Sequence, residues 1–314
     1  MTRIGNALSR QNILVVDGAM GTQLEQRGCD LNDPIWSARL LAESPETVAA
    51  VHTDYLKAGA DCLITASYQA TFEGFSARGV SETAAAGLIR SAVTLARDCV
   101  DTFWADPANR KDRMKPLVAA SVGPYGAYLA DGSEFRGDYN LSESELAAFH
   151  RKRLATLIQA GPDLLACETI PCFSEARALA ALLEEFVPVE AWVSFSARDG
   201  RHISNGEPVR DCAAWLDDKP SVAAVGINCT DPQYIPSLIR EIRWGTDKPV
   251  IVYPNRGGVW DAAAKTWLMD HGLPTFDEMA ARWFDAGARL IGGCCQTGPA
   301  DIRALAKALK QPKT

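Results

Sequence analysis

The chain has 314 residues, of which 47% are hydrophobic, and it carries a formal net charge of −7. That length allows either two domains or one large α/β barrel. The acidic balance and the lack of any Lys/Arg run argue against nucleic acid or an anionic membrane as a partner. No apolar stretch has the length of a membrane-spanning helix, and the N-terminus lacks a signal-peptide pattern. We therefore expect a cytoplasmic protein that acts on small molecules.

Eight short apolar runs follow one another along the chain, and each is too short for a buried helix. Their composition is typical of parallel strands, which are buried on both faces. In chain order the expected strands are residues 13–18, 62–67, 117–124, 164–169, 191–196, 222–229, 250–255 and 289–295.

Helical patterns separate these strands. The clearest covers residues 142–160, where Ser142 and Glu145 form a capping box. Thr275 with Glu278 has the same pattern. Prolines are expected at two further helix starts, and glycines should end three helices in the left-handed conformation. These residues are Pro45 and Pro299, then Gly59, Gly161 and Gly287.

The regular alternation of strand and helix predicts an α/β fold, a single (β/α)8 TIM barrel that spans residues 1–314 as one domain. A doubly wound sheet is the alternative, but no "GxGxxG" follows the first strand. The long irregular segments 123–140, 198–210 and 254–274 all follow strands, so a barrel places them on one face. The glycine-rich segment 123–134 is a candidate lid.

The sequence contains nine cysteines, an odd number that argues against a disulfide scaffold. Cys294 and Cys295 are adjacent at the end of the last expected strand, and Cys229 ends the sixth. A barrel brings these strand ends to one mouth. A disulfide between adjacent cysteines is strained, whereas three thiolates with a fourth position open are typical of catalytic zinc. The alternative is three small buried residues.

Two carboxylates should share this mouth, because Asp17 and Glu168 end the first and fourth strands. A zinc ion with three thiolate ligands is a poor Lewis acid for hydrolysis, but it can hold a substrate thiol as a nucleophilic thiolate. Alkyl transfer to sulfur from a cationic donor fits this chemistry. Asp17 and Glu168 could hold the ammonium group of an amino-acid substrate, or they could order loops.

The motifs "DGAMGT", "LITASYQAT", "GPYGAYLADGSE", "ACET", "GINC", "YPN" and "GGCC" occur in this order. From about Ile13 to Ile302 the chain resembles the homocysteine S-methyltransferase family, and most of all its stand-alone bacterial members that use S-methylmethionine. The resemblance implies a (β/α)8 barrel with one Zn²⁺ per chain. It also implies that the zinc holds L-homocysteine as its thiolate. The implied zinc ligands are Cys229, Cys294 and Cys295, which with Glu168 are the candidate catalytic residues.

The resemblance also implies a substrate pocket. Asp17 and Glu168 would receive the amino group of homocysteine, and the backbone of Gly18 and Ala19 its carboxylate. The residues expected near the methyl donor are Trp36, Tyr68 and Gln69. Asn228 and Tyr253 are further pocket candidates from their strand-end positions, with loop hydrogen bonding as the alternative role.

Other readings stay open. The donor could be S-adenosylmethionine, betaine or a methylfolate, although 314 residues leave no room for a cobalamin module. A non-enzymatic zinc or thiol redox protein built on the same barrel is the second alternative. Nothing in the sequence indicates an oligomeric state.

Overall fold

The expected strands form one parallel sheet that closes on itself. The computed structural model describes residues 2–31, 36–261, 266–268 and 272–310, and its eight-stranded sheet has the order β1-β10-β7-β6-β5-β4-β3-β2. The ring is completed between β1 and β2, where the Asp17 N–H donates to the Cys62 carbonyl over 3.1 Å. The strands are β1 Leu14–Val15, β2 Cys62–Ile64, β3 Leu117–Val122, β4 Leu164–Ile170, β5 Ala191–Phe195, β6 Val222–Asn228, β7 Val250–Tyr253 and β10 Ala288–Ile291.

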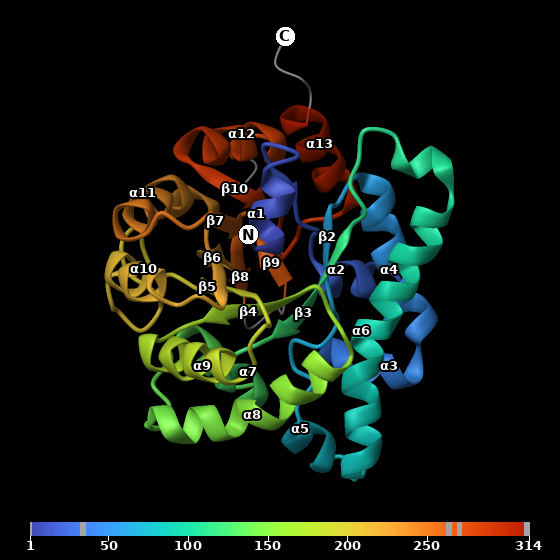
Figure 1. The fold of residues 1–314 in the computed structure, drawn as a ribbon, viewed down its shortest axis with the longest axis vertical. Helices are drawn as coiled ribbons and strands as arrows, with labels where there is room; N and C mark the ends of the chain where they lie inside the picture. The colour runs from blue at the N-terminus through green and yellow to red at the C-terminus, as the bar shows by residue number, and fades with distance from the viewer. Residues whose placement is uncertain (1, 32–35, 262–265, 269–271, 311–314) are drawn as a thin grey trace.

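Helices surround this ring, as Figure 1 shows in a view along the barrel. The predicted (β/α)8 barrel is therefore confirmed, and the doubly wound alternative is wrong. The longer outer helices are α2 Met20–Gln26, α4 Pro45–Ala58, α6 Glu82–Ala105, α8 Glu143–Gln159, α9 Phe173–Glu185, α10 Val209–Asp217, α11 Ile235–Gly245, α12 Phe276–Ala286 and α13 Pro299–Leu309. Shorter pieces are α3 Leu40–Glu43, α5 Phe72–Ser76, α7 Tyr125–Leu129 and the 3-10 turns η1 Trp36–Arg39, η2 Pro107–Arg110, η3 Ser133–Phe135 and η4 Pro232–Tyr234.

The helix signals in the sequence have their expected roles. The Ser142 side chain accepts from the backbone N–H of Glu145, whose carboxylate accepts from the N–H of Ser142. The Glu278 carboxylate likewise accepts from the Thr275 N–H at the start of α12. The remaining signals are also confirmed, with Pro45 and Pro299 in first helical turns and Gly59, Gly161 and Gly287 at positive φ.

Seven of the eight barrel strands end earlier than predicted, and two of these early ends bear on the site. β1 ends at Val15 and β10 ends at Ile291, so Asp17 and the cysteine pair lie in the loops beyond the paired residues. The segment 254–274, expected to be irregular, contains the antiparallel hairpin of β8 Val259–Asp261 and β9 Thr266–Leu268. Part of that segment lies outside the described residues.

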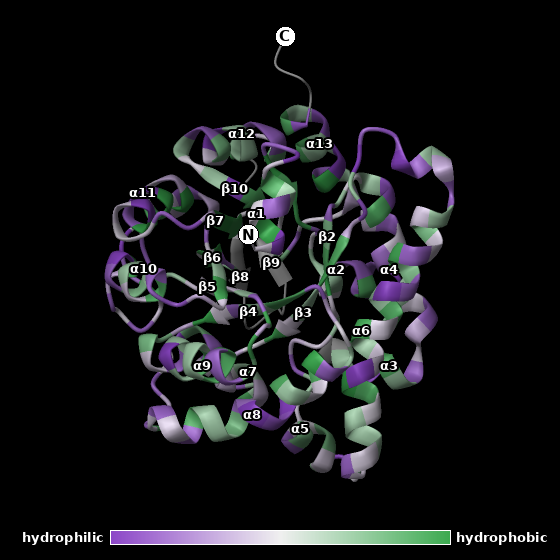
Figure 2. Cartoon of the chain, in the orientation of Figure 1, coloured by the Kyte–Doolittle hydropathy of each residue, from purple (hydrophilic) through white to green (hydrophobic). Residues whose placement is uncertain are grey.

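The barrel interior is a packed core with a closed floor. Trp192 is the largest fully buried side chain of the interior cluster, which also contains small side chains such as Ala119 and Ala224. The helix α1 Arg3–Leu8 places Ile4 and Ala7 in the same cluster. Figure 1 shows α1 in front of the strand ring, and Figure 2 shows apolar strands inside helices with polar outer faces. The N-terminal end of the barrel is therefore plugged by α1.

A second core lies between the sheet and the outer helices. It contains apolar residues from the barrel strands and from the helices that pack against them. Among the described helices, none combines the length and apolar character needed to cross a membrane.

Gly226 provides a test of how tightly β6 and β7 pack. A Cβ atom at this position would overlap the Ile251 carbonyl oxygen and lie 2.6 Å from Ile251 Cγ2. We expect Gly226→Ala to lower the free energy of unfolding by about 2–3 kcal/mol, measured by denaturant titration.

The matched control is Gly87→Ala on α6, where no atom lies within 4 Å of the added Cβ. It should raise stability by about 0.5–1 kcal/mol, because alanine loses less conformational entropy on folding than glycine. Equal effects of the two substitutions would contradict the close approach at Gly226.

Candidate functional site

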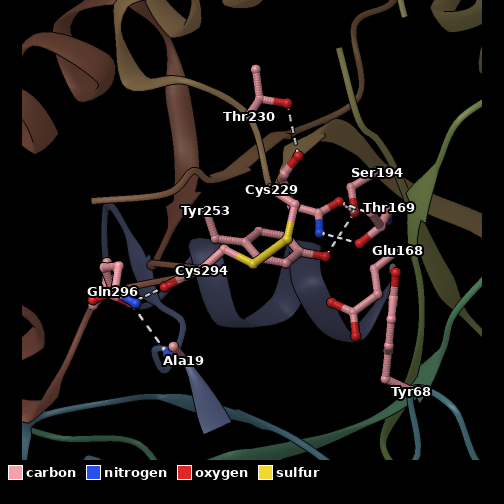
Figure 3. Close-up of a disulfide and its surroundings, with 12 residues drawn as sticks. Ala19, Tyr68, Glu168, Thr169, Ser194, Cys229, Thr230, Tyr253, Cys294 and Gln296 are labelled. Carbon is pink, nitrogen blue, oxygen red and sulfur yellow. Dashed lines mark hydrogen bonds between the residues drawn. A yellow bond between two sulfur atoms is a disulfide. The ribbon is translucent and has the colours of Figure 1, made fainter. Parts of the chain in front are cut away.

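Three cysteine sulfurs meet at the carboxyl ends of the strands. Cys229 follows β6, Cys294 and Cys295 follow β10, and their Sγ atoms all lie within 4.8 Å of one another. All three residues are partly buried. Cys229 and Cys294 are paired as a disulfide with a Cα–Cα distance of 5.5 Å (Figure 3). This pair could not be predicted from the sequence, because Cys229 and Cys294 are separated by 65 residues and become neighbours only in the closed barrel.

Backbone hydrogen bonds fix the cysteines against the end of β7. The Cys294 N–H donates to the Pro254 carbonyl over 2.7 Å, and the Cys229 N–H donates to the Tyr253 carbonyl over 3.3 Å. Cys229 itself has a φ of 46°, which is uncommon for a residue with a side chain. The Thr297 hydroxyl donates to the Cys294 carbonyl over 2.6 Å. Cys229 and Cys294 are thus held against the end of β7 by main-chain contacts.

The glycine pair before the cysteines is required by close packing. A Cβ on Gly292 would lie 2.7 Å from the Asp17 carbonyl oxygen, and a Cβ on Gly293 would lie 2.5 Å from the Thr297 hydroxyl. Glycine at these two positions therefore lets the chain after β10 pass directly against the end of β1.

Asp17 and Glu168 are buried carboxylates beside this cluster, with 3% and 7% of their surfaces exposed. The Asp17 carboxylate accepts from the Ile64 N–H over 2.9 Å. Burial raises the pKa of Asp17 well above its usual value, and the nearby charge of Glu168 raises it further. Burial also raises the pKa of Glu168 to about 7, although hydrogen bonds from Ser121 and Tyr253 partly offset this rise. A pair of desolvated carboxylates is suited to receive a cationic group.

A hydrogen-bond network joins the ends of β4, β5, β6 and β7 (Figure 3). The Asn228 side-chain oxygen accepts from the Thr169 N–H at 2.7 Å and the Ser194 hydroxyl at 2.8 Å, and its NH₂ donates to the Thr169 hydroxyl at 2.7 Å. The Tyr253 hydroxyl shares a hydrogen bond of 2.7 Å with the Ser194 hydroxyl and accepts one of 3.0 Å from the Trp192 indole N–H. Both predicted pocket residues, Asn228 and Tyr253, therefore lie in this network.

Thr169 is the strained member of the network. Its φ is 60°, a left-handed conformation that a β-branched residue rarely adopts. The two bonds from Asn228 hold it there, and Thr169 directly follows Glu168 in the chain. The amide of Asn228 therefore orients both its own neighbour Cys229 and the carboxylate of Glu168.

The other predicted residues lie around this centre. The Tyr68 hydroxyl donates to Glu134 Oε2 over 2.8 Å, and the Gln69 side chain donates to the Ala127 carbonyl over 2.9 Å. A Cβ on Gly18 would clash with the Tyr55 side chain. The Ala19 N–H donates to the Thr297 hydroxyl over 3.2 Å. Trp36 begins η1, but its side chain lies outside the described residues.

Sequence reasoning missed several residues of the site. Ser121 and Ser194 are polar residues inside otherwise apolar strands, and that interruption was a usable signal. Glu134 and Thr297 lie outside the barrel strands, where polar residues are common, so no signal distinguished them. Thr169 lies in β4, and no sequence signal indicated its left-handed conformation.

The cysteine cluster fits a thiophilic metal ion when its cysteines are reduced. Burial raises the pKa of Cys295 to about 12, and the negative charge of Glu134 adds to this effect. Such a thiol is protonated at neutral pH unless a cation stabilises its thiolate. Three sulfurs within one ligand sphere are the donor set that soft divalent metals prefer.

The fold and the site together define an α/β-barrel protein with a cysteine-lined metal site at the carboxyl ends of its strands. The family model described as homocysteine S-methyltransferase matches residues 14–309. The chain belongs to the homocysteine S-methyltransferase family.

Relatives cover the whole chain. The homocysteine S-methyltransferase YbgG of Bacillus subtilis is 54% identical over 314 residues, which is 100% of both chains. The homocysteine S-methyltransferase of Escherichia coli is 50% identical over 300 residues, 95% of this chain and 96% of its own.

Solved structures of the Escherichia coli homocysteine methyltransferase MmuM are also similar. The metallated form has a TM-score of 0.86 at 48% identity and covers 96% of this chain and 97% of its own. The oxidized form has a TM-score of 0.87 at 48% identity and covers 98% of this chain and 99% of its own. The same fold is thus recorded for the metallated and the oxidized forms of this relative.

The raised pKa of Glu168 predicts a pH-dependent effect on stability. Because the folded state holds the Glu168 proton more tightly than the unfolded chain, ionising this residue between about pH 5 and pH 8 destabilises the wild type. In reduced, metal-free protein we expect Glu168→Gln to match the wild type near pH 5. At pH 8 it should be more stable by on the order of 2–3 kcal/mol, measured by urea unfolding.

The control is Glu185→Gln, which removes an exposed carboxylate that pairs with Arg151. This hydrogen bond lowers the pKa of Glu185, so its removal cannot stabilise the protein as the pH rises. A pH-independent difference between Glu168→Gln and the wild type would contradict the burial of an ionising Glu168.

The network around Asn228 predicts a large effect of truncation. Asn228→Ala removes three hydrogen bonds and leaves the buried Thr169 N–H without its partner. We expect a loss of about 2–4 kcal/mol in unfolding free energy, together with weaker metal retention measured by competition with a chelator. Asn109→Ala, which loses one bond to the Phe103 carbonyl, should cost only about 1 kcal/mol and leave metal retention unchanged. Equal metal retention in the two variants would show that Asn228 does not orient Cys229.

Proposed function

We propose that this protein transfers a methyl group from S-methyl-L-methionine to the sulfur of L-homocysteine, so that one methionine arises from each reactant. The observation that carries this proposal is the cluster of three cysteine sulfurs beside two buried carboxylates. Membership of the homocysteine S-methyltransferase family supports the same reaction. We further propose that residues 1–314 form one homocysteine-binding domain.

The proposed metal is one Zn²⁺ per chain, held by Cys229, Cys294 and Cys295 in their reduced state. Thiolate ligands from three protein positions leave a fourth position for a substrate, as is typical of catalytic zinc. When bound, the metal supplies a positive charge that keeps a substrate thiol deprotonated at neutral pH.

The two carboxylates are the proposed site for the homocysteine amino group. Burial raises the pKa of both Asp17 and Glu168, and an arriving ammonium group offsets that desolvation with charge-assisted hydrogen bonds. The Gly18–Ala19 turn would face the substrate carboxylate. Fixing the amino acid at both ends orients its sulfur toward the cysteine cluster.

The methyl donor is proposed to enter on the side of Trp36, Tyr68 and Gln69. A sulfonium donor is positively charged, so the negative groups of the site attract it. Aromatic faces contribute about 0.5–2 kcal/mol to such cation binding. In the transfer the carbon–sulfur bond of the sulfonium breaks, and the homocysteine sulfur supplies the electron pair of the new bond. S-adenosylmethionine, also a sulfonium, is the alternative donor, ahead of betaine and a methylfolate.

The disulfide between Cys229 and Cys294 is the observation that favours a second function, a thiol redox sensor. Neighbouring thiols without a metal are prone to oxidation, so an oxidised enzyme could resemble a sensor. The two functions differ in what the reduced protein does, because only the enzyme needs bound zinc for turnover.

Zinc analysis and donor assays on one reduced batch test the proposal. The wild type should contain about one zinc per chain and form methionine from homocysteine and S-methylmethionine. Cys295→Ser, which leaves the other two cysteines in place, should lose both the zinc and at least about 100-fold in activity. Cys29→Ser changes a cysteine outside the cluster and should retain both.

Two outcomes would overturn the proposal. Turnover only with another donor would reject S-methylmethionine. A reversible two-electron couple in reduced wild type that holds no zinc and forms no methionine would favour the redox sensor.

A further inference from the structure

Glu134 is a carboxylate that the proposed function does not yet use. It lies in η3, within the loop that follows β3. A Cβ on Gly126 of α7 would lie 2.8 Å from Glu134 Cα, so the two turns of this loop are packed backbone to backbone. The preceding Ser133 is only 4% exposed. Glu134 is therefore held at a fixed place in this loop, the candidate lid of the sequence.

The side chain of Glu134 belongs to the site. The Tyr68 hydroxyl donates to Glu134 Oε2 over 2.8 Å. The same hydroxyl interacts with Thr169 and with the charge of Glu168, and Figure 3 shows Tyr68 beside these two residues. Glu134 thus lies beside the site on the side of Tyr68.

This carboxylate has no cationic partner among the described residues. No lysine, arginine or histidine there forms an ion pair with it, and the Tyr68 hydroxyl is its one hydrogen-bond donor. Its second oxygen, Oε1, accepts no hydrogen bond from the described part of the chain. Glu134 is partly buried and burial raises its pKa, so a cation that donates hydrogen bonds would stabilise its ionised form.

Arg153 holds both the loop of Tyr68 and the loop of Glu134. Its buried guanidinium donates to the Tyr68 carbonyl over 3.3 Å and also to the Gly123 carbonyl. The first contact lies in the loop that carries Tyr68, and the second begins the loop that carries Glu134. The Tyr68–Glu134 pair is therefore preorganised rather than assembled by a ligand.

We propose that Glu134, positioned by Tyr68, receives the ammonium group of the methyl donor and thereby selects an amino-acid sulfonium. This inference rests on the proposed function, in which S-methylmethionine is the donor. An ammonium group offers three N–H donors to the free carboxylate oxygen, whereas a sulfonium offers none. Asp17 and Glu168 are already assigned to the ammonium group of homocysteine, so each amino acid has its own acidic partner.

The test compares two ligands in two proteins. At saturating homocysteine, the KM of S-methylmethionine is measured for reduced, zinc-loaded wild type and for Glu134→Gln, which keeps an acceptor for the Tyr68 hydroxyl. The competitive Ki of the des-amino analogue, which retains the sulfonium and the carboxylate, is measured in both. We expect Glu134→Gln to raise the KM of S-methylmethionine about 10- to 100-fold. The Ki of the analogue and the KM of homocysteine should stay unchanged.

Asp131→Asn is the matched control, because it removes one charge from an exposed side chain of the same loop. It should leave every constant unchanged. An unchanged KM in Glu134→Gln, or an equal rise for the des-amino analogue, would overturn the inference while leaving the proposed function intact. No turnover of S-methylmethionine by the wild type would reject the proposed donor, and the inference with it. Zinc content and the thermal midpoint of each variant separate these results from misfolding.

Discussion

The reciprocal hydrogen bonds between Asn228 and Thr169 fix the ends of β6 and β4 relative to each other. Asn228 precedes Cys229, and Thr169 follows Glu168, so one amide orients a sulfur and a carboxylate together. Both Cys229 and Thr169 have positive φ values that the surrounding contacts maintain. The hydrogen bonds of Ser194 and Tyr253 extend the same constraint to β5 and β7. The geometry of the whole mouth therefore depends on a network that a substrate need not touch.

Three carboxylates give the mouth of the barrel its negative character. Asp17 and Glu168 are buried and Glu134 is partly buried, and burial raises the pKa of each. Desolvated acids of this kind favour cations over neutral ligands. The same site therefore has a physical reason to prefer amino acids and sulfonium compounds over uncharged molecules of similar shape.

Much of the fold could be predicted from the sequence because its signals are local. Apolar runs, capping boxes and helix-ending glycines specify each unit, and eight such units allow few arrangements. The convergence of Asp17, Glu168 and Cys229 followed from the barrel. The disulfide and the Glu134–Tyr68 pair could not be predicted, because each depends on loops whose paths are set by tertiary contacts. The left-handed conformation of Thr169 within β4 could not be predicted either, because it is held by the side chain of Asn228 from β6. The role of Asn228 was ambiguous for the same reason.

The plug formed by α1 gives the two ends of the barrel different characters. Ile4 and Ala7 pack into the interior cluster, so apolar side chains close the amino-terminal end. The cysteine cluster lies at the opposite end, where the strands pass into loops. The closed end can therefore accept changes that alter stability without altering the chemistry at the other end.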